Sequence, residues 1–375
     1  MKKIVHVLIN YAYSTGVPNL PFLIAFNFQK SLNNYNNTVL WFRKSDVTPD
    51  ILNDIDNKHI GRLSLFYEIL KIKPCVLLLH GHFGSLRGLC ILLMSKLLYA
   101  KTIAQPDFDE YGFPRLNHKS IFDDLKQFLR YILIYLHTLL TDRIVCWTEA
   151  EKSVFVNRFT KFSNKFYVIP GGGDFTIETL EKENYILTVS GWWADRKNLH
   201  TILKVFNEVI KQKKCKLVII GKFIEGRYHV FDEDRYETGE EYKKKIMGLI
   251  RDLNLEESVK FAGVVDETVK EELFKKAKIF YLPSKSETFG MVFVEAMASG
   301  TPVVAMKNSA VQYVVKDGVT GFLRNTEEGQ KEAILRLLTD EKLYKQMQSD
   351  CLEEAEKYRW EVVVKEWEDL IEGLV

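Results

Sequence analysis

The sequence predicts an α/β protein built from two doubly wound parallel sheets. Short apolar runs rich in Val, Ile, Leu and Phe alternate with helical patterns along the whole chain, which is typical of parallel sheets covered by helices on both faces. The alternation stops at a glycine-rich loop, "IPGGGD" at 169–174, and then starts again. At 375 residues the chain is also long enough for two hydrophobic cores.

The first half is expected to contribute six strands to one sheet. We read these strands at "KIVHVLI", "TVLWFR", "CVLLLHG", "KTIAQ", "RIVCWT" and "KFYVIP", with helical stretches between them at 22–33, 86–99 and 120–141. The opening "MKKIVHVLIN" is interpreted as a strand because its apolar run is shorter than that of a signal peptide and no small-residue cleavage site follows it.

The second half repeats the pattern and ends in helices. Strands are expected at "YILTVSG", "KLVIIG", "VKFAG", "KIFYLPS" and "PVVAM", with helices at 199–211, 240–253, 267–276 and 290–299. The polar and aromatic segment 223–241 is predicted to be a surface insertion after a strand, and 326–374 is helical throughout. Two similar α/β halves joined near residue 175 are the simplest interpretation.

Composition excludes several classes of protein. The net charge of +2 argues against a nucleic-acid binder, although the first 180 residues are mildly basic and the remainder mildly acidic. The five cysteines are scattered without metal-ligand spacing, which predicts reduced thiols and a cytoplasmic protein with neither a zinc site nor a disulfide framework. No apolar run reaches the length of about 18 residues that a membrane span needs.

A carboxylate inside an apolar helix is the most informative feature of the second half. The stretch "KIFYLPSKSETFGMVFVEAMASGTPVVA" (278–305) predicts a buried strand, a polar loop that contains Glu287, and a short helix that contains Glu295. Burying an ionised group without a partner costs several kcal/mol, so such a group normally has a partner or a task.

The position of this helix indicates a ligand site. The helix begins directly after the carboxyl end of a parallel strand, where open α/β sheets bind ligands. Its first N–H groups, at Phe289, Gly290 and Met291, suit phosphate oxygens. Carboxylates only accept hydrogen bonds, so Glu287 and Glu295 on either side of an anion suit the hydroxyls of a sugar and of a ribose. Alternatively, Glu295 pairs with a Lys or Arg against the core and Glu287 is a solvated loop residue.

A second loop at the same sheet edge carries two cations. In "YILTVSGWWADRKNLHTILKVF" (185–206), Arg196 and Lys197 stand at the opening of a helix, where cations oppose the helix dipole unless an anion lies between them. Contacts from Lys and Arg to phosphate are the obvious use of such charges. Alternatively, the charged loop only solvates the start of the helix.

Together these segments resemble a known family. "SETFGMVFVEAMASGTPVVA" is similar to the E-x7-E signature of retaining, family-4-type glycosyltransferases of the GT-B fold. "GWWADRKN" stands where that family has a Gly-Arg pair and a Lys-Gly pair, and "FYVIPGGGD" resembles its interdomain element. "RIVCWTEAEK" resembles its usual strand-then-Ser/Thr step, and "RWEVVVKEWEDLI" resembles its closing helix. The resemblance covers nearly the whole chain.

The resemblance implies two Rossmann-like domains that face each other across a cleft. Residues 1–175 would form the acceptor domain, 176–358 the nucleotide-sugar domain, and 359–375 a helix that returns to the first domain. The implied reaction moves a sugar from a UDP-, GDP- or ADP-sugar to a hydroxyl of a glycan, a lipid-linked sugar or a small molecule, with retention at the anomeric carbon.

Roles in the second domain follow from matched positions. Glu287, Phe289 and Gly290, with Met291 beside them, would hold the donor sugar and its phosphate, while Glu295 would hold the ribose. The remaining assignments are Lys197 to the diphosphate, Val264 and Val265 to the nucleobase, and Gly221 and Lys222 to the lining of the same cleft.

The sequence departs from the family pattern at two positions. The family's diphosphate arginine would fall on Trp192, so either Arg196 replaces it or phosphate binding is weaker. The asparagine expected after Pro170 is Gly171, which a turn tolerates.

The first domain contributes two candidates. His82 in "LLLHGHFGSLRG" matches the histidine that lies at the donor-sugar face in relatives, and it is a stronger candidate than His80. Gly16 in "NYAYSTGVPNLP" falls in the first strand-to-helix loop, which in relatives approaches the donor phosphates and the acceptor.

The expected mechanism uses neither a metal nor a cofactor. The helix start at Gly290, with Lys197 and Arg196, would stabilise the charge on the departing diphosphate, and the D-x-D pattern "DFD" at 107–109 lies in an irregular loop. A nucleotide-sugar epimerase or hydrolase and a non-catalytic nucleotide-sugar-binding protein remain alternatives. An NAD-linked dehydrogenase is disfavoured because no G-x-G-x-x-G follows a strand.

The acceptor side is open. Residues 106–141 combine aromatics, cations and a strongly apolar helix, which suggests peripheral contact with the cytoplasmic face of a membrane and a lipid-linked acceptor. The alternative is a helix packed in the core of its own domain. The sequence does not indicate an oligomeric state.

Overall fold

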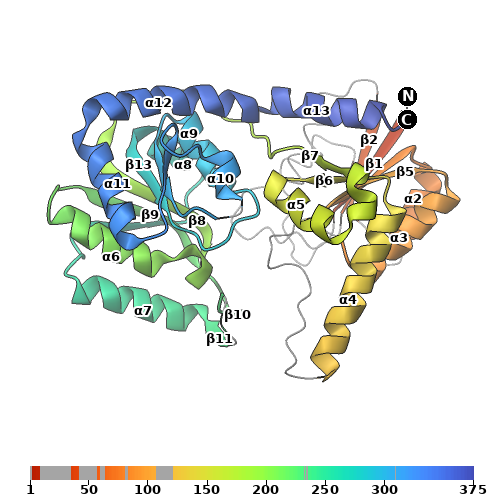
Figure 1. The fold of residues 1–375 in the computed structure, drawn as a ribbon, viewed down its shortest axis with the longest axis horizontal. Helices are drawn as coiled ribbons and strands as arrows, with labels where there is room; N and C mark the ends of the chain where they lie inside the picture. The colour runs from red at the N-terminus through yellow and green to blue at the C-terminus, as the bar shows by residue number, and fades with distance from the viewer. Residues whose placement is uncertain are drawn as a thin grey trace. The chain divides into compact units, whose positions relative to one another are not determined.

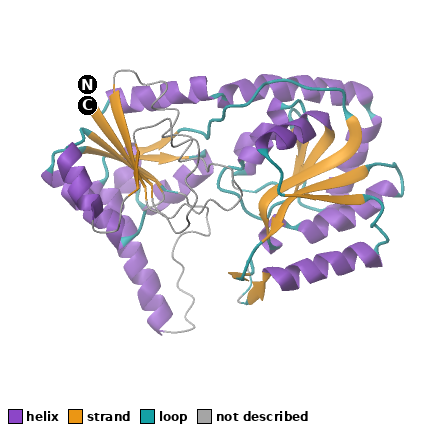
Figure 2. Ribbon diagram, turned by 180° about the vertical axis from the view of Figure 1, so that it is seen from behind, coloured by secondary structure: helices purple, strands orange, loops and turns teal. Residues whose placement is uncertain are grey.

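The chain forms two compact units, each a sheet covered by helices (Figures 1 and 2). A computed structural model describes residues 2–8, 35–41, 57–59, 64–80, 83–106, 121–231, 233, 235–308 and 310–375. Unit 1 comprises Met1–Gly173 with Arg359–Val375, and unit 2 comprises Asp174–Tyr358. The α/β class with parallel, doubly wound sheets is confirmed.

Unit 1 contains a seven-stranded parallel sheet in the order β3-β2-β1-β4-β5-β6-β7. The strands are β1 (Lys2–Leu8), β2 (Tyr35–Trp41), β3 (Asn57–His59), β4 (Val76–His80), β5 (Lys101–Gln105), β6 (Arg143–Cys146) and β7 (Phe166–Val168). The described helices are α2 (Ser64–Ile72), α3 (Leu86–Leu97), α4 (Ile121–Leu140), α5 (Glu149–Arg158), the 3₁₀ helix η2 (Thr160–Lys165) and α13 (Trp360–Glu372). Every residue of β4 is buried, which explains its continuous apolar run.

Unit 2 contains a six-stranded parallel sheet in the order β12-β9-β8-β13-β14-β15. Its strands are β8 (Glu183–Trp193), β9 (Lys216–Phe223), β12 (Val259–Gly263), β13 (Ala277–Leu282), β14 (Val303–Ala305) and β15 (Gly321–Leu323). Its helices are η3 (Asp195–Lys197), α6 (Leu199–Ile210), α7 (Gly239–Asp252), α8 (Glu267–Lys276), α9 (Met291–Ala298), α10 (Val311–Val314), α11 (Glu327–Thr339), α12 (Glu341–Ala355) and η4 (Glu356–Tyr358).

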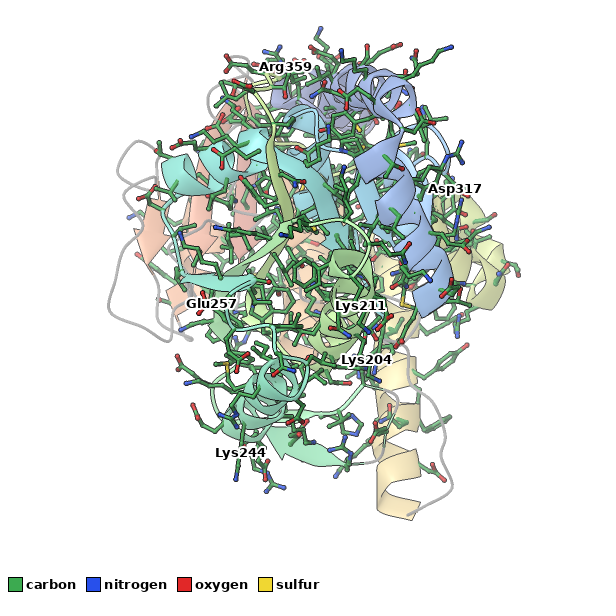
Figure 3. All side chains as sticks on the ribbon, turned by 90° about the vertical axis from the view of Figure 1, so that its left-hand side faces the viewer. Lys204, Lys211, Lys244, Glu257, Asp317 and Arg359 are labelled. Atoms are coloured by element: carbon green, nitrogen blue, oxygen red, sulfur yellow. The ribbon has the colours of Figure 1, made fainter. Side chains whose placement is uncertain are left out.

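The helices of unit 2 follow the amphipathic pattern read from the sequence. α6 buries Ile202, Leu203 and Phe206 against the sheet, while Lys204 and Lys211 stand at the surface (Figure 3). Figure 1 shows α6 and α7 on one face of the sheet, with α8, α9 and α12 on the other. The predicted helices of this half are confirmed to within one or two residues.

The predicted insertion at 223–241 is a small hairpin. β10 (Arg227–His229) pairs antiparallel with β11 (Tyr236–Thr238), and Thr238 then caps α7. Its hydroxyl accepts from the Glu241 N–H while the Glu241 carboxylate accepts from the Thr238 N–H, which is a capping box.

Buried polar groups occupy neighbouring strands of unit 1. His6, His80 and Gln105 lie on β1, β4 and β5, and all three are buried. His80 Nδ1 donates to Gln105 Oε1 at 2.9 Å, and His6 Nδ1 lies 3.4 Å from His80 Nε2. Burial lowers the pKa of His80 from 6.5 to about 4 and outweighs the opposing effect of the Gln105 hydrogen bond, so the ring is neutral at pH 7.

One element expected from the sequence lies outside the described residues, and a second segment lies partly outside them. The helix expected at 22–33 lies outside them, and the apolar segment 106–141 is described only from its helical part onward. Within the described part of the chain, no helix has the length and apolar character that crossing a bilayer requires.

Acidification is expected to destabilise unit 1 through His80. The unfolded chain takes up a proton at this histidine near pH 6.5, but the folded chain does so only near pH 4. Between these values the unfolded state binds more protons, so the free energy of unfolding falls as the pH falls, by up to about 3 kcal/mol. Urea unfolding at pH 7 and pH 4.5 should show a smaller pH dependence for His80→Gln than for the wild type. Equal pH dependence in the two proteins would contradict this assignment.

Candidate functional site

A tight loop leads from the buried strand β13 into α9. Glu287 lies in this loop and is only 7% exposed, although it is charged. Gly290 precedes the helix with φ of +89°, and a Cβ there would lie 2.6 Å from the ring of Phe293. Only glycine fits both the backbone angle and the space. Gly290 has no side chain to cap α9, and the Phe293 N–H turns back to the Gly290 carbonyl at 3.0 Å. The N–H groups of Met291 and Val292 donate to no capping side chain among the described residues.

Glu287 pairs with a cation from the neighbouring loop. Lys197 Nζ lies 2.6 Å from Glu287 Oε1, and both side chains are largely buried. The backbones of the two loops are also joined, because the Lys285 N–H donates to the Arg196 carbonyl at 2.9 Å. The Asn198 amide adds a second link by donating to the Pro283 carbonyl at 3.2 Å. The ends of β8 and β13 therefore present one connected surface.

The electrostatic surroundings keep Glu287 ionised. Burial alone would raise the pKa of its carboxyl group, but the charges of Lys197 and Arg196, together with hydrogen bonds to the carboxylate, lower that pKa below its usual value. Arg196 itself makes no ion pair with any residue in the described part of the chain. The loop thus holds one paired cation and one available cation.

Glu295 lies further along α9 and also pairs with a lysine. Lys270 of α8 lies 3.1 Å from Glu295 Oε1 and 2.6 Å from Glu267 Oε1. Burial would lower the pKa of Lys270, but the two carboxylates raise it overall. The other oxygen, Glu295 Oε2, is buried and has no hydrogen-bond partner among the described residues. The salt link that was the structural alternative for Glu295 is therefore present, and one acceptor oxygen remains.

Comparison with known families identifies this half of the chain. Residues 174–352 match the family described as Glycosyl transferases group 1. The chain carries a glycosyl transferases group 1 domain.

The curated relatives that match the group 1 domain carry the names of glycosyltransferases and related synthases. The chain is 26% identical over 193 residues to N-acetyl-alpha-D-glucosaminyl L-malate synthase of Bacillus anthracis, which covers 51% of this chain and 45% of that protein. It is 26% identical to a probable sucrose-phosphate synthase of Thermosipho melanesiensis, over 61% of this chain and 54% of that protein. An uncharacterized glycosyltransferase of Haemophilus influenzae is 28% identical over 63% of each chain. The matches thus span about half to three fifths of these relatives.

Solved structures match both units. Sucrose-phosphate synthase from Thermosynechococcus elongatus superposes with a TM-score of 0.75 at 16% identity, over 100% of this chain and 99% of that chain. Anabaena Alr3699/HepE in complex with UDP and glucose superposes with a TM-score of 0.74 at 18% identity, over 100% of both chains. At these identities the likeness establishes the fold, and the expected GT-B fold with two Rossmann-like units is confirmed.

In the group 1 domain Lys222 lies beside Trp192, the residue that stands where the family pattern has an arginine. Lys222 faces Trp192 across paired strands, and its ammonium lies 4.3 Å from the centre of the indole ring. Lys222 also pairs with Glu225 at 2.8 Å. Gly221 has φ of +117°, and a Cβ there would collide with the Ser190 carbonyl, so this close approach requires glycine.

The other residues predicted for the group 1 domain lie near the same sheet edge in different environments. Val264 and Val265 follow the carboxyl end of β12, and Val264 is exposed. Phe289 is buried with its ring 5.9 Å from that of Tyr358, so its side chain serves packing and its backbone is what the loop presents. Met291 begins α9. Gly16 and His82 of the first domain lie outside the described residues.

Sequence reasoning missed three residues that shape the group 1 site. Asn198 adopts a left-handed backbone with φ of +62° before α6, and Asp195 accepts hydrogen bonds from the Phe231 N–H at 3.0 and 3.1 Å. Lys270 supplies the partner of Glu295. Asn198 could have been found, because Asn is one of the few residues that tolerate the left-handed region. The other two contacts join segments distant in sequence and leave no local signal.

A cavity of about 580 Å³ lies beside this site. It is open to solvent and lined by the hairpin, α6 and α7, with Asp195, His200, Lys204 and Lys285 among its lining residues. Neither Glu287 nor Glu295 lines it. It is therefore separate from the pair of carboxylates.

Gly290→Ala should destabilise the group 1 domain by about 1–3 kcal/mol, because the new methyl group combines an unfavourable positive φ with a clash against Phe293. Denaturant unfolding measures the change. Gly248→Ala is the matched control, because a Cβ at this helical position of α7 meets nothing within 4 Å and should be neutral or stabilising. An equal effect of the two substitutions would contradict the assigned geometry.

Proposed function

We propose that this protein transfers a sugar from a nucleotide diphosphate sugar to an acceptor hydroxyl, with retention at the anomeric carbon and without a metal. The observation that carries the proposal is the buried ion pair of Lys197 and Glu287 at the uncapped start of α9. An acceptor-only group, a cation and the N–H groups of a helix start are the three elements that a sugar, a diphosphate and their linkage require. The family membership of residues 174–352 and the names of the relatives support the same activity.

Each carboxylate receives a separate part of the donor. Glu287 accepts hydrogen bonds from the hydroxyls of the transferred sugar, and its lowered pKa keeps it in the accepting form near neutral pH. Glu295 accepts from the ribose hydroxyls through Oε2, the oxygen that Lys270 leaves unused. A polar ligand group at that oxygen would remove the cost of a buried acceptor without a partner.

The cations act on the leaving group. Negative charge builds on the diphosphate as the bond to the sugar breaks, and stabilising charge in the transition state lowers the barrier. Arg196, Lys197 and the first N–H groups of α9 provide that stabilisation. Lys222, held on the face of Trp192, supplies a further cation near the position where the family arginine is missing.

For the acceptor and the cellular compartment, the proposal names a class rather than a single molecule or site. The acceptor hydroxyl belongs to a glycan, a lipid-linked sugar or a small molecule, and unit 1 binds it. We place the reaction in the cytoplasm, a setting that keeps the five thiols reduced.

The first experiment identifies the donor. UDP-, GDP- and ADP-sugars are tested for protection against thermal unfolding, because a ligand that binds only the folded state raises the melting temperature. Glu287→Gln should then lower kcat with the selected donor about 100-fold. Glu208→Gln is the matched control, since Glu208 is an exposed partner of Lys211 and its loss should leave kcat unchanged.

Product analysis separates the proposal from its alternatives. Transfer requires an acceptor-dependent product with the donor's anomeric configuration, read by NMR, and activity that persists in excess EDTA. Sugar release or epimerisation without an acceptor, full activity of Glu287→Gln, or strict dependence on added Mg²⁺ or Mn²⁺ would each contradict it.

Trp192→Arg should tighten binding of the nucleoside diphosphate about tenfold, because it restores a charge-assisted contact to phosphate. Isothermal titration calorimetry measures the dissociation constant. Trp192→Phe, which keeps an aromatic face for Lys222, is the control and should bind as the wild type does. An unchanged dissociation constant for Trp192→Arg would show that this position does not face the phosphates.

A further inference from the structure

Asp195 is a buried carboxylate at the head of the loop that carries the two cations. It opens η3 and is only 6% exposed. Arg196 and Lys197 follow it directly in the chain. By charge alone a carboxylate at this place weakens the binding of a phosphate to those cations, because like charges repel. A buried negative charge here therefore needs a reason other than ligand charge.

The carboxylate of Asp195 binds the end of the first hairpin strand. The Phe231 N–H, 36 residues further along the chain, donates to Asp195 Oδ1 at 3.1 Å and to Oδ2 at 3.0 Å. The hairpin backbone is itself fixed at this point, because the Val230 N–H donates to the Arg235 carbonyl at 3.0 Å. A hydrogen bond from an N–H group to a carboxylate is stronger than one between neutral groups. Asp195 thus ties its loop to the hairpin.

The same carboxylate reaches the loop that carries Glu287. Lys285 Nζ lies 3.4 Å from Asp195 Oδ2 and 5.9 Å from the centre of the Phe231 ring. The backbone N–H of Lys285 also donates to the Arg196 carbonyl at 2.9 Å. The hairpin, η3 and the loop between β13 and α9 are therefore joined at one buried carboxylate.

The backbone of η3 carries the position of Asp195 to the cations. The Lys197 N–H donates to the Ala194 carbonyl at 3.0 Å, and the Asn198 N–H donates to the Asp195 carbonyl at 2.9 Å. Because these bonds close a single 3₁₀ turn, a shift of Asp195 also shifts Lys197 and its ion pair with Glu287. A misplacement of about 1 Å in a binding group can lower the rate of an enzyme about 100-fold.

We propose that Asp195 is a positioning residue of the donor site, which holds Arg196 and Lys197 against the hairpin so that both face the diphosphate. Asp195 itself contacts neither sugar nor phosphate and acts through its loop. The inference rests on the proposed function, since it requires a diphosphate at these two cations. It also gives the hairpin a role, because the hairpin supplies the fixed N–H group to which the loop is tied.

Calorimetric titration with two probes tests the role of Asp195. The first probe is whichever of UDP, GDP and ADP the wild type binds most tightly, and the second is the matching nucleoside monophosphate. Asp195→Ala removes the acceptor for the Phe231 N–H and should weaken binding of the diphosphate about tenfold, with a smaller loss for the monophosphate. Asp195→Asn removes the same charge but keeps an acceptor oxygen, so it should bind the diphosphate at least as tightly as the wild type.

Two further variants complete the design. Asp195→Glu keeps the charge but lengthens the side chain by one methylene, so it should also displace the loop and weaken diphosphate binding, which provides a second displaced variant if Asp195→Ala does not fold. Glu233→Ala is the matched control and should bind as the wild type does, because Glu233 is an exposed partner of Arg235 that lines the same cavity. Melting temperatures show which variants are folded.

The results separate this inference from the proposed function. Wild-type protein that binds none of the three diphosphates, or a Lys197→Ala variant that binds as the wild type does, would contradict the proposed function and this inference with it. If Lys197→Ala weakens binding, three results overturn the role of Asp195 alone. These are unchanged or tighter diphosphate binding in a folded displaced variant, equal losses in Asp195→Ala and Asp195→Asn, and equal losses for the two probes, which a merely structural role would give.

Discussion

The ion pair between Lys197 and Glu287 is the interaction on which the rest of the candidate site depends. Both side chains are largely buried, and their charged atoms are 2.6 Å apart. Removing one partner of such a pair leaves an unpaired buried charge and costs about 3–5 kcal/mol. In the free protein Lys197 therefore helps to keep Glu287 ionised. A donor that brings hydroxyls to the carboxylate and phosphate to the ammonium satisfies both without returning them to water.

The parallel sheet explains how this pair is brought together from residues 90 positions apart. β8 and β13 are neighbours, so their carboxyl ends and the loops that follow them meet at one edge. Left-handed residues, Asn198 and Gly290, stand before α6 and α9 and allow each helix to start close to its strand. The direct backbone link between Lys285 and Arg196 then holds the two loops in register.

The fold could be predicted from the sequence because the alternation of strands and helices is a local signal. The elements of unit 2 follow it closely, and the glycine-rich loop lies where the two units meet in the sequence. Gly290 and Glu287 were also readable, since a glycine before an apolar helix and a carboxylate in the preceding loop are adjacent in the chain. For Glu295 the sequence was not sufficient. Its spacing from Glu287 suggested a ligand contact, but its partner Lys270 comes from another helix and could not be read from the local sequence.

Contacts that join distant segments carried no sequence signal. Trp192 was read as the loss of a phosphate-binding arginine, but the register between β8 and β9 places the ammonium of Lys222 over its ring. The apolar helix near residue 130 was open to two interpretations, membrane contact and packing in its own core. In the structure Ile134, His137 and Thr138 of α4 are buried in unit 1, while the preceding residues 128–132 are exposed.

The most direct test of the account is a crystal structure of the protein with the nucleotide sugar that best protects it against unfolding. The account predicts the diphosphate at the first N–H groups of α9 beside Lys197, with hydroxyls of the transferred sugar donating to Glu287 and the ribose at Glu295. Electron density for the nucleotide sugar at another place, with the Lys197–Glu287 and Lys270–Glu295 pairs unchanged, would contradict it.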